Sequence, residues 1–358
     1  MIFFYLSAGI FYSLGWILFF RGRYLPSSPH QNQVEISIIV PARNEQDNLQ
    51  KLLPRLNEQE SKPAEIIVVD DQSTDQTASI AKKHSATVLQ LFEHPKTWLG
   101  KTLACQRGAE ASKGQWLLFL DADVQPEKDF LTRIAGCDPK PGTVLGIMPF
   151  HNICKTYENA SLLFQLITVF STRAFSWPKP SQALGMFGQC MLIHREDYQK
   201  IGGHEAVKSQ VVENFSLGQK MNQLGIEKQY YLGKGSLSMR MFPTGLADLI
   251  RGWSKTFLKG SSLVPTAWMT LISLWISSAM FTFFSLLGTE EPWRTYSMML
   301  YLLFAFQIWW LGRRLGKFSL LGGIFFPLHF CFYNVIFFRS LWKKCTGQKE
   351  HWKGRELD

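Results

Sequence analysis

Charged residues are missing from four long stretches of this sequence. Residues 1–20, 260–289, 295–312 and 318–338 contain no Asp, Glu, Lys or Arg. A helix needs about 20 apolar residues to cross the hydrocarbon core of a bilayer, so these stretches are long enough or nearly so. The charge-bearing segment 34–258 between them argues against a pure channel. We therefore expect a membrane-attached protein with transmembrane helices at both ends.

Paired cysteines and a concentrated basic block are absent as well. The six cysteines are scattered without a Cys-x-x-Cys pair, which suits a reducing compartment, and no His/Cys grouping has zinc-ligand spacing. The net charge is +10, but many Lys and Arg residues flank the apolar stretches. Attraction to anionic lipid headgroups explains that placement better than nucleic-acid binding does. We expect a membrane partner and no nucleic-acid partner.

The first apolar stretch is either an uncleaved anchor, residues 1–24, or a signal peptide. No basic residue precedes it and no small-residue cleavage site follows it, which favours the anchor. Arg21 and Arg23 on its C-terminal side place the following domain in the cytoplasm by the positive-inside rule. The expected location is the cell membrane, with several crossings and a cytoplasmic catalytic domain.

The C-terminal part divides into three expected segments. Residues 236–259 combine apolar and basic side chains and predict amphipathic interfacial helices, with Trp253 as a membrane-interface anchor. Transmembrane segments are expected over 260–338, followed by a basic tail, 339–358. Three crossings would leave that tail outside, against the positive-inside rule. The last span is therefore a candidate re-entrant or interfacial segment, since it contains Gly322, Gly323 and Pro327.

Strand and helix patterns alternate in the remaining segment, 34–235. Apolar runs predict buried strands near 34–41, 65–70, 86–91 and 116–120, and helical patterns follow them. Such alternation predicts an α/β fold with a mostly parallel sheet, right-handed crossovers and flanking helices. We expect this segment to be one catalytic domain.

Acidic residues directly follow two of these strands. Asp70 and Asp71 end one apolar run, and Asp121 and Asp123 follow another. Ligands of open α/β sheets gather at the carboxyl ends of strands. Carboxylates one residue apart can face one hard cation, which predicts a Mg²⁺ or Mn²⁺ site shared with substrate phosphates. A turn or cap role is the alternative for Asp70 and Asp121.

Two basic residues lie in loops near this edge. Arg43, in the turn PARNE after the first strand, fits contact with a nucleotide; the alternative is a solvated turn in which Asn44 caps the next helix. Lys101 belongs to WLGKT, which resembles the end of a phosphate-binding P-loop. Position 95 is Pro where that motif needs Gly, so an ATPase is excluded. Lys101 remains a candidate cation for a diphosphate.

Residues 185–225 contain a Gly-rich approach to a strand and then a helix that starts at Glu213. An acidic residue is favoured at a helix N-terminus by the helix dipole, so capping is the alternative role for Glu213. We expect His204 to be a surface polar residue and not a metal ligand.

The sequence contains, in this order, SIIVPARNE, IIVVDDQSTDQT, WLGKTLACQRG, LLFLDADV, GQCMLI, GGHEAVKSQVVENFSLGQKM and WKGR. The chain resembles family-two glycosyltransferases of the GT-A fold, which have such segments in the same order. The match covers about residues 36–258, and the tail 351–357, which contains WKGR, adds to it. Membrane segments around the domain are similar to the branch that acts on lipid acceptors, including a carotenoid acid. The chain lacks the Gln-x-x-Arg-Trp element of the processive branch, so it is expected to transfer a single sugar.

The resemblance implies inverting transfer from a nucleotide-diphosphate sugar, with UDP-glucose expected, and a bound Mg²⁺ or Mn²⁺. It also implies the roles of individual residues. The nucleotide pocket is lined by Pro41, Ala42, Arg43 and Glu45, Asp71 meets the uracil, Asp121 the ribose and diphosphate, Asp123 the metal, and Gln189 and Cys190 the acceptor.

One position departs from the family pattern. Many members have a Glu-Asp pair whose Asp is the general base, whereas this chain has Glu213-Asn214. Asn cannot accept the proton, so Glu213 becomes the expected base. A carboxylic acid acceptor is already ionised near pH 7 and needs a base less than an alcohol does. This substitution therefore favours formation of a glycosyl ester.

Other functions stay open from the sequence. The acceptor could be another lipid, such as a hopanoid, a ceramide or a glycerolipid. Asn214 also allows a catalytically silent membrane scaffold with the same fold. A nucleotidyltransferase uses paired acids too, but a Gly-rich triphosphate loop is missing near the first strand.

Overall fold

The computed structural model describes residues 1–27, 34–93, 95, 97–180, 183–210, 213–261, 264–346, 350–352 and 355–357. The chain divides into two compact units. One, the α/β unit, comprises residues 23–151, 185–241 and 349–358. The other, the helical unit, comprises residues 1–22, 152–184 and 242–348. Residues 152–184, which fall inside the expected catalytic segment 34–235, thus belong to the helical unit.

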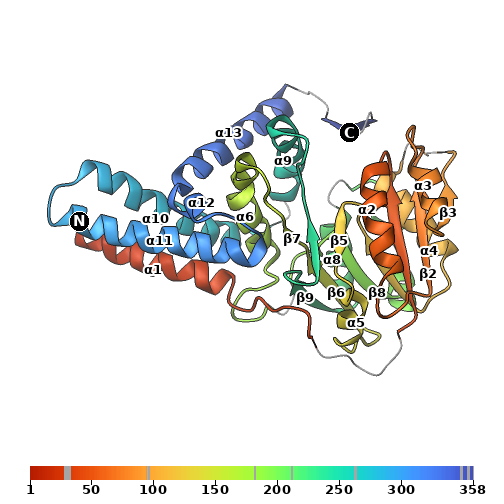
Figure 1. The fold of residues 1–358 in the computed structure, drawn as a ribbon. Helices are drawn as coiled ribbons and strands as arrows, with labels where there is room; N and C mark the ends of the chain where they lie inside the picture. Colours follow the sequence, from red (N-terminus) through yellow and green to blue (C-terminus); the bar gives the residue numbers. More distant parts are fainter. Residues whose placement is uncertain are drawn as a thin grey trace. The chain divides into compact units, whose positions relative to one another are not determined.

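The central sheet of the α/β unit has seven strands in the described part of the chain, in the order β3-β2-β1-β4-β8-β6-β9 (Figure 1). They are β1 (Ile36–Ala42), β2 (Glu65–Asp70), β3 (Thr87–Gln90), β4 (Trp116–Leu120), β6 (Thr143–Met148), β8 (Cys190–His194) and β9 (Glu227–Leu232). Strands β3, β2, β1 and β4 are parallel, β8 is antiparallel to both of its neighbours, and β6 pairs in parallel with β9. The expected mostly parallel α/β sheet is confirmed.

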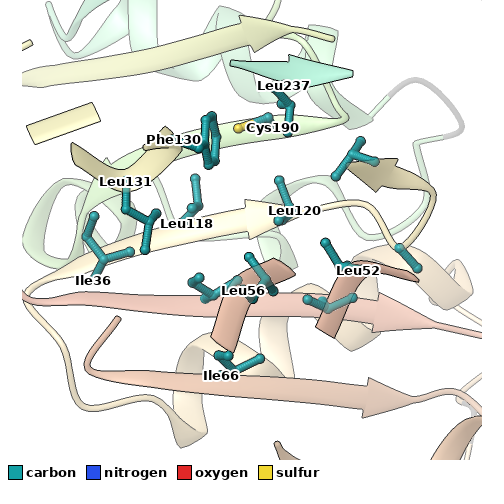
Figure 2. Packing of buried hydrophobic residues seen from close by; sticks show 14 of the residues in the cluster. Ile36, Leu52, Leu56, Ile66, Leu118, Leu120, Phe130, Leu131, Cys190 and Leu237 are labelled. Atoms are coloured by element: carbon teal, nitrogen blue, oxygen red, sulfur yellow. The ribbon is translucent and has the colours of Figure 1, made fainter. Parts of the chain in front are cut away.

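Helix α2 (Gln46–Asn57) covers one face of this sheet. Its apolar stripe consists of Leu49, Leu52, Leu53 and Leu56, all fully buried. Alternate residues of a strand point to the same face. The stripe therefore packs on every second residue of the neighbouring strands, such as Ile36, Ile66, Leu118 and Leu120 (Figure 2). Helix α5 (Phe130–Ala135) adds Phe130 and Leu131 to the same core.

The remaining elements of the α/β unit connect or extend the sheet. They are α3 (Thr77–Lys83), α4 (Gly100–Ala111), α7 (Arg195–Lys200), η2 (Glu205–Val207), α8 (Glu213–Gln223) and the short hairpin of β11 (Glu350–Trp352) and β12 (Arg355–Leu357). A second small sheet joins β5 (Val124–Pro126), β10 (Leu237–Met239) and β7 (Phe150–His151). Strand β10 lies where the sequence predicted interfacial helix, so that prediction is wrong for 237–239. Two positions of the WKGR motif, 353 and 354, lie outside the described residues.

The helical unit contains helices from both ends and from the middle of the chain. They are α1 (Ile2–Leu18), η1 (Thr156–Ser161), α6 (Leu162–Thr172), α9 (Leu246–Ser261), α10 (Thr266–Gly288), α11 (Trp293–Leu315), α12 (Leu320–Ile324) and α13 (Phe326–Cys345). Helices α1, α10 and α11 run side by side (Figure 1). The expected last span, 318–338, is interrupted between α12 and α13 at Phe325, beside Gly322, Gly323 and Pro327.

A buried amide joins the three long helices. Gln307 of α11 is fully buried, accepts a 2.8 Å hydrogen bond from Nε1 of Trp275 in α10, and donates one of 2.9 Å to the carbonyl of Tyr12 in α1. Gly15 of α1 leaves the space for these side chains, because a Cβ there would lie 2.5 Å from both Gln307 Oε1 and Trp275 Nε1. Helix α1 is thus an integral part of the helical unit.

One helix of the described residues is long and apolar enough to cross a membrane, α10. Helix α1 is apolar but has only 17 residues. Helix α11 includes Arg294, Arg313 and Arg314. Membrane crossings at both ends of the chain, and a multi-pass arrangement, are therefore not supported by the helices observed.

The expected interfacial role of Trp253 is also wrong. Its side chain is 8% exposed, stacks on Phe164 of α6 with ring centroids 4.7 Å apart, and donates a 3.1 Å hydrogen bond from Nε1 to Oγ of Ser161. Leu249, one turn earlier on α9, is fully buried. The described apolar face of α9 therefore packs inside the helical unit.

Candidate functional site

The acidic strand ends lie together at one edge of the sheet. Strand β1 lies between β2 and β4 and is parallel to both, with Ala42 paired with Asp70. Asp71 follows β2, and its N–H donates a 2.8 Å hydrogen bond to the carbonyl of Ala42. Asp121 follows β4. The chain leaves β1 toward β2 on one side and reaches β4 on the other, which is the switch point where α/β sheets bind ligands.

The loop after β1 is tied to the loop after β2. Arg43 donates from Nη1 to the carbonyl of Asp71 at 2.7 Å. Asn44, with φ of +51°, donates its N–H to Oγ of Ser73, and its Oδ1 accepts from the N–H of Thr74. Asn44 therefore does not cap α2, contrary to one of the two expectations for this turn. The network fixes the strand ends that border the edge.

Besides Arg43, four sequence-predicted nucleotide residues, Pro41, Ala42, Glu45 and Asp71, lie in these two loops or beside them. Pro41 and Ala42 end β1, with Ala42 buried and Pro41 half-buried. Glu45 is half-buried, and its Oε2 accepts from Nδ2 of Asn48 at 2.6 Å. Asp70 behaves as the turn residue that was its alternative, because its Oδ1 accepts from the N–H of Ser73. Asp71 is buried, with 3% of its surface exposed.

Asp123 is the most perturbed acid of the site. Burial, and the nearby carboxylates of Asp121 and Glu45, raise the pKa of Asp123 to about 7. Its Oδ1 is buried and has no hydrogen-bond partner within the described residues. A buried carboxylate oxygen without a donor is costly unless a ligand satisfies it. The site thus concentrates negative charge where a cation would be stabilised.

Lys101, near the start of α4, provides positive charge at this edge. Its Nζ lies 2.6 Å from Oδ1 of Asp121 and 3.8 Å from Oε1 of Glu213, and it donates a 3.1 Å hydrogen bond to the carbonyl of Gly188. Asp121 therefore uses its side chain in an ion pair, not in a helix cap. Asp121 follows β4 and Glu213 begins α8, so Lys101 connects segments that are distant in the sequence.

Glu213 begins α8 with a neighbouring amide as partner. Nδ2 of Asn214 donates a 2.8 Å hydrogen bond to Oε1 of Glu213. Position 188 must be glycine for this arrangement, because a Cβ there would lie 2.1 Å from Nδ2 of Asn214. The Asn214 amide and Gly188 were not among the sequence-predicted site residues, although the Glu-Asn pair marked the position.

The two expected acceptor residues differ in their placement. Gln189 is half-buried, and its carbonyl accepts a 3.0 Å hydrogen bond from the N–H of Asp121. Cys190 pairs with Leu120 in the sheet and is completely buried in the core (Figure 2). Burial and the Asp121 carboxylate raise the pKa of the Cys190 thiol. Gln189 therefore lies half-buried beside Asp121, whereas the Cys190 side chain packs in the core.

His204 is not the surface residue that the sequence suggested. It is 2% exposed, its Nδ1 lies 2.9 Å from the hydroxyl of Tyr198, and its ring packs edge-on against Phe119. Burial lowers the pKa of His204 to about 3, so the ring stays neutral. It is a core histidine with a satisfied hydrogen bond.

No group of three or more His, Cys, Asp or Glu side chains in the described part of the chain is arranged to hold a metal ion by itself. A Mg²⁺ site often uses only one or two carboxylates, with the remaining ligands from substrate phosphates and water. Asp123, with its buried unpartnered oxygen, and Asp121 fit such a shared site.

Comparison with known proteins identifies the architecture. Residues 37–202 match the family model Glycosyl transferase family 2. The chain is 32% identical to 4,4'-diaponeurosporenoate glycosyltransferase of Staphylococcus haemolyticus (strain JCSC1435), over 98% of this chain and 96% of that protein. It is also 32% identical to the protein of the same name from Staphylococcus aureus (strain USA300), over 91% of this chain and 88% of that one.

A solved structure shows the same fold. The mannosyltransferase from Pyrobaculum calidifontis, in complex with GDP-Man and Mn²⁺, superposes with a TM-score of 0.53 at 15% identity, covering 86% of this chain and 95% of that one. The fold and the relatives define a glycosyltransferase with the GT-A architecture. The chain belongs to glycosyl transferase family 2.

Proposed function

We propose that this protein transfers one hexose from a nucleotide-diphosphate sugar to a carotenoid carboxylic acid or a chemically similar membrane lipid, with inversion at the anomeric carbon. UDP-glucose is the first donor to test. The acceptor class is supported by the relatives named 4,4'-diaponeurosporenoate glycosyltransferase, which match nearly the whole chain. The observation that carries the proposal is the acidic edge of the sheet. Asp121 and Asp123 follow β4 near Glu45, and Lys101 lies between Asp121 and Glu213.

In this proposal the nucleotide lies against the ends of β1 and β2. Pro41, Ala42 and Glu45 border the base and ribose, and the buried Asp71 carboxylate accepts from a base N–H. Arg43 holds the backbone of Asp71, so it shapes the pocket even where it does not contact the ligand. A rigid strand-end pocket of this kind positions the donor without reorganisation.

Asp123 and Asp121 would hold a Mg²⁺ or Mn²⁺ ion together with the donor diphosphate. When bound, the cation neutralises charge on the leaving diphosphate. The protein supplies the two carboxylates and fixes Asp121 by its ion pair with Lys101 and by the backbone bond to Gln189. The raised pKa of Asp123 reflects its burial and the repulsion from Asp121 and Glu45, and a cation would offset both.

Glu213 stands on the acceptor side of the site. With an alcohol acceptor its carboxylate would take the hydroxyl proton as the oxygen attacks the anomeric carbon and the diphosphate leaves from the opposite face. With a carboxylic acid acceptor the attacking oxygen is already anionic near pH 7, and Glu213 serves mainly to orient it. Asn214, which cannot accept a proton, suits the second case.

The lipid acceptor requires contact with a membrane. Helix α10 has the length and composition for one crossing, and α1 is apolar and packed beside it. Many apolar side chains of the helical unit are exposed, including Phe3, Ile10, Leu287 and Val335. Lipid would cover such side chains. We therefore infer association with the cell membrane, with the α/β unit on the cytoplasmic side.

The direct test uses purified protein and UDP-glucose with Mn²⁺. We expect release of UDP, faster when a carotenoid acid in detergent micelles is present, and a product that mass spectrometry identifies as a glycosyl ester. Asp123→Ala should abolish both the release of UDP and the formation of the ester. UDP-glucose incubated without protein, as the control, should stay intact. Wild-type protein that neither binds UDP nor turns over any UDP-sugar would reject the proposal and favour a catalytically silent membrane protein of the same fold.

The acceptor is identified best in cells. Lipid extracts from cells with and without the gene should differ by one hexose on one lipid class. Hexosylated hopanoid, ceramide or glycerolipid in place of a hexosylated carotenoid acid would keep the enzyme class and replace the acceptor.

A further inference from the structure

The ammonium group of Lys101 contacts three segments that are far apart in the sequence. It lies 2.6 Å from Asp121 after β4, donates to the carbonyl of Gly188 before β8, and lies 3.8 Å from Glu213 at the start of α8. In the proposed site, Asp121 lies on the side of the sugar donor and Glu213 on the side of the acceptor.

Hydrogen bonds of the neighbouring residues Leu99 and Thr102 hold the backbone of Lys101 in place at the first turn of α4. The N–H of Leu99 donates a 2.9 Å hydrogen bond to the carbonyl of Lys208. The hydroxyl of Thr102, 1% exposed, donates to the carbonyl of Leu99 and lies within 3.2 Å of the carbonyl of Lys208. The base of the Lys101 side chain is therefore fixed, and its ammonium reaches a defined point.

Neighbouring residues take most of the hydrogen-bonding capacity of this ammonium group. An ammonium has three N–H donors, and Asp121 and Gly188 each lie at hydrogen-bonding distance from it. These two partners leave one donor, and a diphosphate oxygen would have to compete for it with the Glu213 carboxylate 3.8 Å away.

We propose that Lys101 is a positioning residue, which holds the Asp121 and Glu213 carboxylates at a fixed separation and does not itself bind the donor diphosphate. The sequence had suggested a direct contact with the diphosphate. This inference rests on the proposed function, because Lys101 would affect the reaction by positioning Glu213, whose role is part of that proposal. Its consequence is that the charge of Lys101 sets the rate of transfer and not the affinity for the nucleotide.

The experiment separates these two roles in the full-length protein. With an alcohol acceptor, for which Glu213 would act as the base, Lys101→Met should lower kcat by about 100-fold, since small displacements of reacting groups have effects of that size. The Kd of UDP, measured by calorimetry with Mn²⁺, should stay within about threefold of wild type. Lys101→Arg keeps the charge and should recover most of the lost kcat, although a guanidinium differs in shape.

Arg107 gives the matched control on the same helix. It is an exposed residue that pairs with Glu110 at 2.8 Å, and Arg107→Met should leave both kcat and the Kd of UDP unchanged. Lys101→Gln, which retains a polar side chain, replaces Lys101→Met if thermal unfolding shows that the Met variant is not folded.

A double-mutant cycle with Glu213→Gln tests the coupling. If Lys101 acts through Glu213, the loss from Lys101→Met should be at least about tenfold smaller in the Glu213→Gln background than in wild type. Equal losses in both backgrounds, an unchanged kcat, or a Kd of UDP weakened about tenfold or more would overturn the inference while the wild-type activity stands. Absence of UDP binding and turnover in the wild-type protein would instead overturn the proposed function, and this inference with it.

Discussion

The amide of Asn214 donates a 2.8 Å hydrogen bond to the carboxylate of Glu213, the residue before it on α8. Two adjacent acids at this place would repel each other, whereas an amide beside an acid stabilises the ionised carboxylate. The Glu-Asn pair therefore leaves one carboxylate at the helix start, held by its neighbour and by Lys101 at 3.8 Å.

Glu213→Gln should separate two classes of acceptor. With an alcohol acceptor, we expect a loss of about 10²–10⁴ in kcat, the usual contribution of a positioned base. With a carboxylic acid acceptor the loss should stay below about tenfold, because the nucleophile is already ionised. The measurement is steady-state turnover of UDP-glucose with each acceptor, and Glu110→Gln on the exposed face of α4 is the control. Equal and severe losses on both acceptors would contradict the ester hypothesis.

Gly188→Ala should damage the site through Asn214. The new Cβ would lie 2.1 Å from Nδ2 of Asn214 and 2.9 Å from its Cγ, so the amide must leave Glu213. We expect a stability loss of about 1–3 kcal/mol, as for other overpacked sites, together with reduced turnover. Thermal unfolding and activity are measured side by side.

The double variant Gly188→Ala/Asn214→Ala supplies the matched control for this prediction. The three heavy atoms nearest to the added Cβ all belong to Asn214, so removing that side chain should restore most of the lost stability. A double variant as unstable as Gly188→Ala would place the cause of the damage elsewhere in the loop.

Asp123 makes the stability of the metal-free protein dependent on pH. Its pKa is raised to about 7, against about 3.9 for an aspartate in an unfolded chain. Between these values the native state binds more protons than the unfolded state. The free energy of unfolding therefore falls as the pH rises from about 4 to about 7. Asp123→Asn removes this contribution.

We expect Asp123→Asn to unfold at a higher temperature than wild type at pH 8 in EDTA, by about 2 °C or more, with a smaller difference at pH 5. The measurement is thermal unfolding at both pH values. Exposed Asp47 provides the control, because Asp47→Asn should shift the unfolding temperature little at either pH. A wild-type protein as stable as Asp123→Asn at pH 8 would show that the buried carboxylate carries no such cost.

The parts of the fold that follow from local pattern were predicted from the sequence. Apolar runs located β1, β2, β3, β4 and β8, and the period of the leucines located α2. Because the carboxyl ends of parallel strands lie at one edge of a sheet, the sequence alone predicted that Asp71 and Asp121 lie close together. These predictions needed only residue order and chain direction.

The parts that depend on tertiary contacts could not be predicted in this way. The segment 236–259 looked amphipathic, but its first residues pair as β10 with two other strands. His204 looked polar, but its partners Tyr198 and Phe119 come from other elements. The contacts of Lys101 with Asp121 and Glu213 likewise join residues that are 20 and 112 positions away along the chain. Sequence pattern carries no signal for such pairings.

Trp253 tests whether α9 is held by protein or by lipid. Because its ring stacks on Phe164 and its Nε1 bonds Ser161, Trp253→Ala should lower stability by about 3–5 kcal/mol, and Trp253→Phe by a smaller amount. Trp342 on α13 is the matched control, since it is 68% exposed and Trp342→Ala should cost far less in detergent. Thermal unfolding and the membrane-bound fraction of each variant are compared. If Trp253→Ala left stability unchanged but released the protein from membranes, the side chain would be an interfacial anchor after all.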